Sequence, residues 1–146
     1  MYLHVVVLGP FNHIWNTMKK TVSLTSFENK HHMKSDGKGG DYSGPTIKKI
    51  LHSETKLLEL EQHVGDNFKP FIELLRSLAN VHTLCSSSKL NPDFEMILNE
   101  FTINMEECYK KFQLSKPLTT HIISHIIRTA IKSKIGANHI KSWIIS

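Results

Sequence analysis

His121 and His125 stand four residues apart in the stretch HIISH. On an α-helix this spacing places both imidazoles on one face, as a pair of zinc ligands requires. A zinc protease also needs a glutamate directly after the first histidine as its general base, and Ile122 occupies that position. The sequence shows no third ligand. We therefore interpret the pair as histidines at the edge of a core, and we predict no metal site and no cofactor. His121 and His125 remain weak candidates for metal ligands.

Two further patterns resemble sites but lack required parts. The stretch GKGGDYSG over residues 37–44 is rich in glycine, but it lacks the Gly-Lys-Ser/Thr ending of a P-loop, and no buried strand precedes it. Cys85 and Cys108 each lie in an apolar helical pattern, so we expect buried free thiols in a reducing compartment. Serine, cysteine and histidine all occur in the chain, but nothing in the sequence brings them together. We predict no catalytic residue.

The charged residues are distributed unevenly along the chain. The net charge is +5, and all 13 acidic residues lie between Glu28 and Glu107. Every charged residue after Glu107 is basic. This pattern is typical of a solvated helix face whose acidic partners lie elsewhere in the fold. Segments that contact nucleic acid show the same asymmetry.

If the basic segment contacts nucleic acid, its side chains would bind phosphates without reading the base sequence. The residues we predict for this role are Arg128, Lys132, Lys134 and Lys141. Trp143 adds a surface that would either stack on bases or join Ile140 and Ile144 in a small apolar face that docks on a protein. The sequence leaves both alternatives open, and it does not indicate an oligomeric state.

No stretch approaches the roughly 20 apolar residues of a membrane span. The opening YLHVVVLG has no basic region before it and no cleavage pattern after it, so it does not match a secretory signal. We therefore expect an intracellular protein that makes no membrane contact.

Apolar residues recur with helical spacing through most of the chain, which predicts an all-α fold. We expect a loose N-terminal helix that starts at Pro10 within residues 1–20, then a flexible linker or disordered loop over 21–45. Residues 46–135 should form a small bundle of about four main helices whose neighbours pack antiparallel, and 136–146 a C-terminal tail. The four expected helices cover 46–64, 66–85, 92–112 and 117–135.

Three stretches carry a resemblance to a known group of proteins: LGPFNHIW over 8–15, GDNFKPFIELLRSLANVHTLC over 65–85 and LNEFTINMEECYKKFQLSKPLTTHIISHI over 98–126. Together they resemble a helical region of uncharacterised, transposon-encoded proteins that occur in many copies in animal genomes. Those proteins look like relatives of DNA transposases with an Asp-Asp-Glu catalytic core. The resemblance leaves out residues 21–45 and 127–146.

In such transposases, carboxylates hold two divalent ions that activate the attacking hydroxyl and stabilise the leaving oxygen. The resemblance implies that the first catalytic aspartate would lie upstream of Met1 and that the last carboxylate would follow the segment that matches 116–126. Because no acidic residue follows Glu107, no residue here inherits a role from that last helix. The resemblance thus implies a non-catalytic fragment, located in the nucleus, with weak association to DNA or protein. The alternative is an independent helical module, unrelated to transposons, that binds a protein through an exposed apolar helix face.

Overall fold

The computed structural model describes residues 2–33, 41–86 and 91–134. These residues form seven α-helices and a short 3₁₀ helix, and they contain no β-strand, so the fold is all-α as predicted. The helices are α1 (Tyr2–Lys19), α2 (Thr25–Lys30), α3 (Gly44–Leu51), α4 (Glu54–Val64), α5 (Lys69–Ser86), α6 (Phe94–Phe112) and α7 (Lys116–Lys134), with the 3₁₀ turn at Asp66–Phe68.

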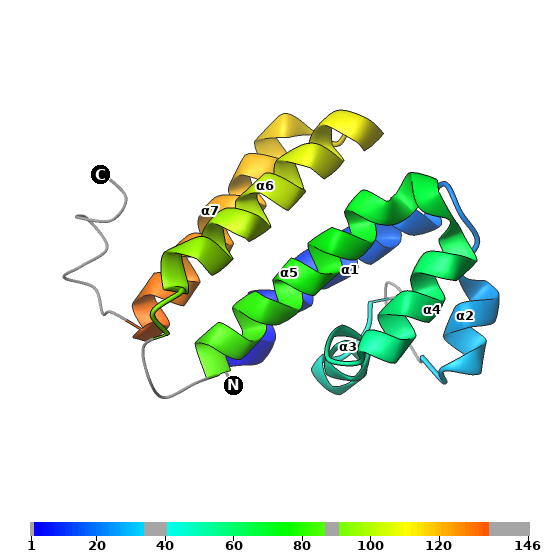
Figure 1. Ribbon diagram of the computed structural model, residues 1–146, viewed down its shortest axis with the longest axis horizontal. Helices are drawn as coiled ribbons and strands as arrows, with labels where there is room; N and C mark the ends of the chain where they lie inside the picture. Colours follow the sequence, from blue (N-terminus) through cyan, green and yellow to red (C-terminus); the bar gives the residue numbers. More distant parts are fainter. Residues whose placement is uncertain (1, 34–40, 87–90, 135–146) are drawn as a thin grey trace.

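The helices form three groups that lie side by side (Figure 1). The α1–α5 pair occupies the middle, the α6–α7 pair lies along one side of it, and the short helices α2, α3 and α4 lie on the other. The long helices α5, α6 and α7 alternate in direction, because the connections between them are short. The core runs through all three groups, and its largest fully buried side chains are Trp15, Phe11, Phe71 and Phe101.

The N-terminal helix is not loose, and it does not begin at Pro10. Helix α1 is continuous from Tyr2 to Lys19 with Pro10 inside it, and it packs against α3, α5 and α7. Phe11, Ile14 and Trp15 are at most 1% exposed. A proline in a helix interior removes one backbone hydrogen bond and costs about 3 kcal/mol. Burial of the large side chains that follow Pro10 outweighs that cost, since each fully buried large apolar side chain contributes about 1.5–3 kcal/mol.

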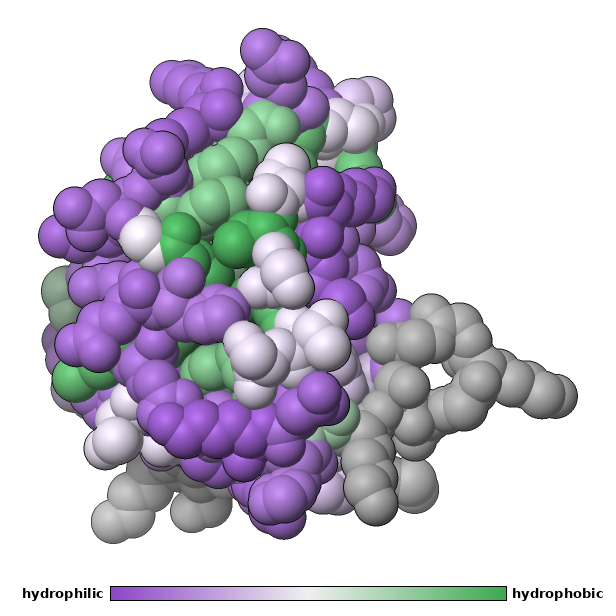
Figure 2. Space-filling model, turned by 90° about the vertical axis from the view of Figure 1, so that its right-hand side faces the viewer, coloured by the Kyte–Doolittle hydropathy of each residue, from purple (hydrophilic) through white to green (hydrophobic). Residues whose placement is uncertain are grey.

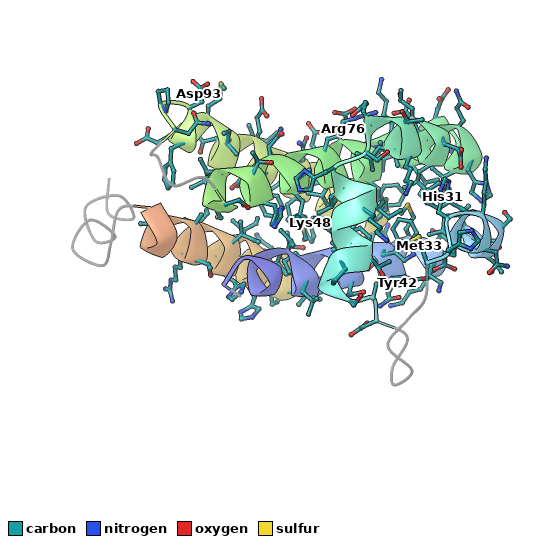
Figure 3. The ribbon with its side chains drawn as sticks, turned by 90° about the horizontal axis from the view of Figure 1, so that it is seen from below. His31, Met33, Tyr42, Lys48, Arg76 and Asp93 are labelled. Carbon is teal, nitrogen blue, oxygen red and sulfur yellow. The ribbon has the colours of Figure 1, made fainter. Side chains whose placement is uncertain are left out.

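The prediction of a flexible linker over 21–45 is wrong for most of the described part of that segment. Residues 25–30 form α2, and four apolar side chains are buried: Leu24, Phe27, Met33 and Tyr42. Contacts with the N-terminal helix, which no local pattern reveals, hold this segment in place. Figure 3 shows Tyr42 just before the start of α3. Residues 34–40 lie outside the described part of the chain.

The single helix predicted over 46–64 is two helices. Helix α3 ends at Leu51, and Ser53 caps the start of α4 by accepting a hydrogen bond from the Lys56 backbone N–H at 3.2 Å. Gly65 then ends α4 with φ +88° and ψ 173°, a conformation that residues other than glycine adopt only with strain. The other expected boundaries agree with α5 and α6 to within a few residues, and the Asn91 side chain accepts from the Asp93 N–H just before α6 begins.

Candidate functional site

A groove with a largely apolar lining lies between α1 and α7. Its larger part is a depression of about 440 Å³. Its lining comes from Leu8, Gly9, Pro10 and His13 of α1 and from Leu118, His121, Ile122 and His125 of α7. A second depression of about 350 Å³ shares His13 and Leu118 with the first and continues along α1 past Lys20 to the α6–α7 turn. We call the two together the α1–α7 groove.

Helical spacing explains why these residues meet. On α7, Leu118, His121, Ile122 and His125 follow the i, i+3, i+4, i+7 pattern of one helix face. On α1, Pro10 and His13 flank the fully buried stripe of Phe11 and Ile14, so they lie at the edge of the contact with α7. At Gly9 the backbone of α1 is open to the groove, since a Cβ added there would meet nothing within 4 Å.

The floor of the groove is apolar and its rim is neutral or basic. Ile122 is buried, whereas Leu118 keeps 38% of its surface exposed. Burial lowers the pKa of His13, and the positive charge of Lys20 lowers it further, so His13 is neutral at pH 7. No carboxylate lines either depression.

Figure 2 views the molecule from the side on which α2 and α4 lie in Figure 1. Apolar surface gathers near the middle of this face, and hydrophilic side chains surround it. The lining of the α1–α7 groove is likewise largely apolar, which is the usual character of a binding site.

The structure brings His121 and His125 together on one exposed face of α7, as the sequence predicted for a helix. Although His13 lines the same depression, no three histidine, cysteine, aspartate or glutamate side chains in the described ranges are arranged to hold a metal ion.

The residues predicted to contact nucleic acid are only partly described. Arg128 is exposed on α7. Lys132 and Lys134 belong to the last turn of α7, where the backbone alone is described, and Lys141 and Trp143 lie outside the described residues. Lys110, Lys111, Lys116 and Arg128 make no ion pair within the described chain.

Sequence reasoning missed a buried carboxylate. Glu28 of α2 is 7% exposed, and its Oε2 atom accepts hydrogen bonds from Trp15 Nε1 at 3.0 Å and from the Tyr42 hydroxyl. Lys19 Nζ lies 3.2 Å from the same oxygen. Burial raises the pKa of Glu28, but the bonds from Tyr42, Trp15 and Lys19 outweigh burial and hold the pKa below its ordinary value.

The phenol of Tyr42 responds in the opposite direction. Its burial and the adjacent Glu28 carboxylate raise its pKa, so the hydroxyl stays protonated and keeps donating. The Tyr42 backbone exchanges two hydrogen bonds with the Asn12 side chain, at 2.8 and 3.1 Å. These contacts fasten α2 and the residues around Tyr42 to α1, and no buried side-chain nitrogen or oxygen in the described residues lacks a hydrogen-bond partner. We therefore interpret the role of these contacts as structural.

Two other polar clusters also have structural geometry. Arg76 of α5 forms ion pairs with Glu54 and Glu73 at 2.9 and 2.7 Å and with Glu61 at 3.5 Å, which ties α4 to α5 (Figure 3). His52 Nε2 lies 2.8 Å from Nδ1 of the buried His82, which joins the end of α3 to α5. Apart from Arg76 and Glu73, which lie three residues apart on α5, the members of these pairs are 15 or more residues apart, so a pattern search along the sequence does not find them.

The fold and the groove define this chain as an all-α protein with an apolar surface site, and comparisons with known proteins add nothing more specific. No protein-family model matches the chain, and neither the curated proteins nor the solved structures contain a match. None of the described helices combines the length and the apolar character that a membrane crossing needs.

Proposed function

We propose that the chain is a non-catalytic helical binding module whose α1–α7 groove receives an apolar segment of another protein. The observation that carries the proposal is the shape and lining of the groove: about 440 Å³ of open space over Leu8, Pro10, Leu118 and Ile122. An apolar side chain placed there would remove these residues from water, and each buried CH₂ contributes about 0.8 kcal/mol.

The roles of the reactive side chains support a binding function over a catalytic one. Burial and the nearby Glu107 raise the pKa of the Cys108 thiol to about 12, which leaves it protonated and unreactive. Glu28 already accepts from two donors and contacts a lysine. The groove itself offers neither a carboxylate nor a thiol among its lining residues.

Binding of an apolar dye to two matched variants tests the proposal. Leu118→Asp places a charge in the groove, whereas Ile103→Asp places the same charge on α6, where Ile103 is 55% exposed and lines neither depression. With the uncharged dye Nile red, we expect one saturable site in the unmodified protein and in Ile103→Asp, and at least tenfold weaker binding in Leu118→Asp. Equal dye binding by both variants, with unchanged circular dichroism, would disprove the proposal.

A second function, non-specific association with nucleic acid, is favoured by the distribution of ion pairs. Every ion pair in the described chain involves residues between Lys19 and Arg76, and Lys110, Lys111, Lys116 and Arg128 have no acidic partner there. Unpaired surface cations can bind phosphates and release counterions, so affinity should fall steeply with salt.

Fluorescence polarisation with two unrelated DNA duplexes tests this second function. We expect similar affinities for both duplexes at 50 mM salt and a loss of about tenfold or more at 200 mM. Arg128→Glu should weaken binding, whereas Lys49→Glu on the exposed side of α3 should do so less. Absence of binding at 50 mM salt would exclude this function.

We also propose that the chain derives from the helical region of a transposase-like protein, because of the three stretches that resemble that group. An intracellular and nuclear location is part of the same proposal. The genomic flanks test the origin: they should encode remnants with the upstream aspartate and the downstream glutamate, and clean flanks would refute it. Microscopy of a fluorescent fusion tests the location.

A further inference from the structure

The α1–α7 groove is elongated. Its two depressions meet at His13 and Leu118 and together follow α1 from Leu8 to Thr21. The helical part of this stretch, from Leu8 to Lys19, is about 17 Å long at 1.5 Å per residue, and Lys20 and Thr21 in the following turn extend it. That length equals three to four turns of a bound helix and exceeds what one small apolar molecule would fill.

The walls of the groove also favour a helical occupant. Helices α1 and α7 run side by side in opposite directions (Figure 1). A third helix laid over two packed helices places its apolar ridge between them, and its side chains at i, i+3, i+4 and i+7 then point into the same furrow. One such apolar residue would enter the depression over Pro10 and Ile122, and another the depression beside Phe71 and Phe112.

The charged residues around the groove are basic, and this favours a partner with acidic residues. Lys19 is engaged with the buried Glu28, but Lys20 lines the groove and makes no ion pair within the described chain. On α7, the exposed Lys116 and Arg128 lie beyond the two ends of the lining stretch Leu118–His125. With no carboxylate in the lining, a basic partner would meet only like charge.

We propose that the groove binds an acidic amphipathic helix of three to four turns, with leucine-like residues on one face and carboxylates beside them. This inference rests on the proposed binding function and names the chemistry of its partner. The partner's carboxylates would pair with Lys20 at one end of the groove, and the three histidines would border its apolar face.

Two designed peptides of 16 residues test the inference. Both carry leucines at positions 2, 5, 6, 9, 12 and 13; the polar positions are glutamate in one peptide and lysine in the other. Fluorescence anisotropy in 50 mM salt should show the glutamate peptide binding at least tenfold more tightly than the lysine peptide. Its helicity by circular dichroism should increase on binding.

Three variants locate the binding. Lys20→Glu should weaken binding of the glutamate peptide by three- to tenfold. Lys49→Glu, which makes the same change in net charge at an exposed site on α3, should change binding less than twofold. Leu118→Asp should abolish binding of both peptide and dye.

The outcomes separate this inference from the proposed function. Equal binding of the two peptides, or equal effects of Lys20→Glu and Lys49→Glu, would overturn the acidic partner while leaving the apolar site intact. Dye binding without any peptide binding would overturn the helical partner. If the unmodified protein showed no saturable dye binding, the proposed function itself would be overturned.

Discussion

Replacing Glu28 with glutamine keeps the shape of the side chain and removes the charge that three donors share. Trp15 Nε1, the Tyr42 hydroxyl and Lys19 Nζ all point at one oxygen, Glu28 Oε2. Hydrogen bonds to a charged group contribute about 1.5–3 kcal/mol, against about 1 kcal/mol for neutral ones. Because the donors share one acceptor, their contributions do not add in full. We expect Glu28→Gln to lower the free energy of unfolding at pH 7 by about 2 kcal/mol.

The pH dependence of that loss follows from the direction of the pKa shift. The folded state holds the pKa of Glu28 below its ordinary value of 4.5. A carboxyl with a lowered folded pKa contributes its full stability above the unfolded pKa, and the contribution disappears as the pH falls through the folded pKa. The difference in stability between the unmodified protein and Glu28→Gln should therefore be largest at pH 6–7 and shrink steadily below about pH 4.5.

Urea unfolding followed by far-ultraviolet circular dichroism measures both effects. Glu100→Gln is the matched control, because Glu100 is exposed on α6, and its effect should stay within about 0.5 kcal/mol. In a double-mutant cycle, Tyr42→Phe and Glu28→Gln should show a coupling energy of about 0.5–3 kcal/mol. If Glu28→Gln is as stable as Glu100→Gln, or if its deficit does not change with pH, the shared-acceptor argument fails.

Three further predictions concern single residues. Alanine should have opposite effects at two glycines: Gly9→Ala, in a helix with free space around it, should raise the free energy of unfolding by about 0.5–1 kcal/mol. Gly65→Ala, at φ +88°, should lower it by about 1–3 kcal/mol, and thermal unfolding compares the two. Arg76→Gln leaves three glutamates without their cation, so it should lower stability by about 1 kcal/mol at low salt and by less in 1 M NaCl; an equal loss at both salt concentrations would contradict the ion-pair explanation. Cys108, whose pKa burial raises to about 12, should resist iodoacetamide at pH 8 until urea unfolds the chain, and peptide mass spectrometry would detect any modification in the native state.

Local signals were sufficient to predict the long C-terminal helices. The spacing of Phe71, Leu75 and Leu78, after a glycine that ends the preceding helix, predicts α5. Asn91 and Pro92 indicate the start of α6. These features act within a few residues of the boundary that they determine, so a single sequence is enough to recognise them.

The segment after α1 and the groove depend on partners that are distant in sequence. Glu28 is 13 residues from Trp15, and Tyr42 is 30 residues from Asn12, so composition alone made 21–45 look like a linker. The groove joins two helices that are more than 90 residues apart, one of which contains a proline that favoured a later start. The sequence predicted that His121 and His125 share one helix face at the edge of a core, and the structure places them beside His13 on an apolar depression.

Because α1 packs against both α5 and α7, the two contact surfaces of α1 are covered at different times during synthesis of the chain. At a typical rate of 5–20 residues per second, α1 waits several seconds for α5 and several more for α7. Its docking on α5 covers Phe11 and Trp15 early, whereas the wall formed by Leu118 and Ile122 arrives last. A nascent chain that has folded through α5 therefore still lacks the groove. The walls of the groove are complete only once residues 118–125 of α7 have been synthesised and have packed against α1.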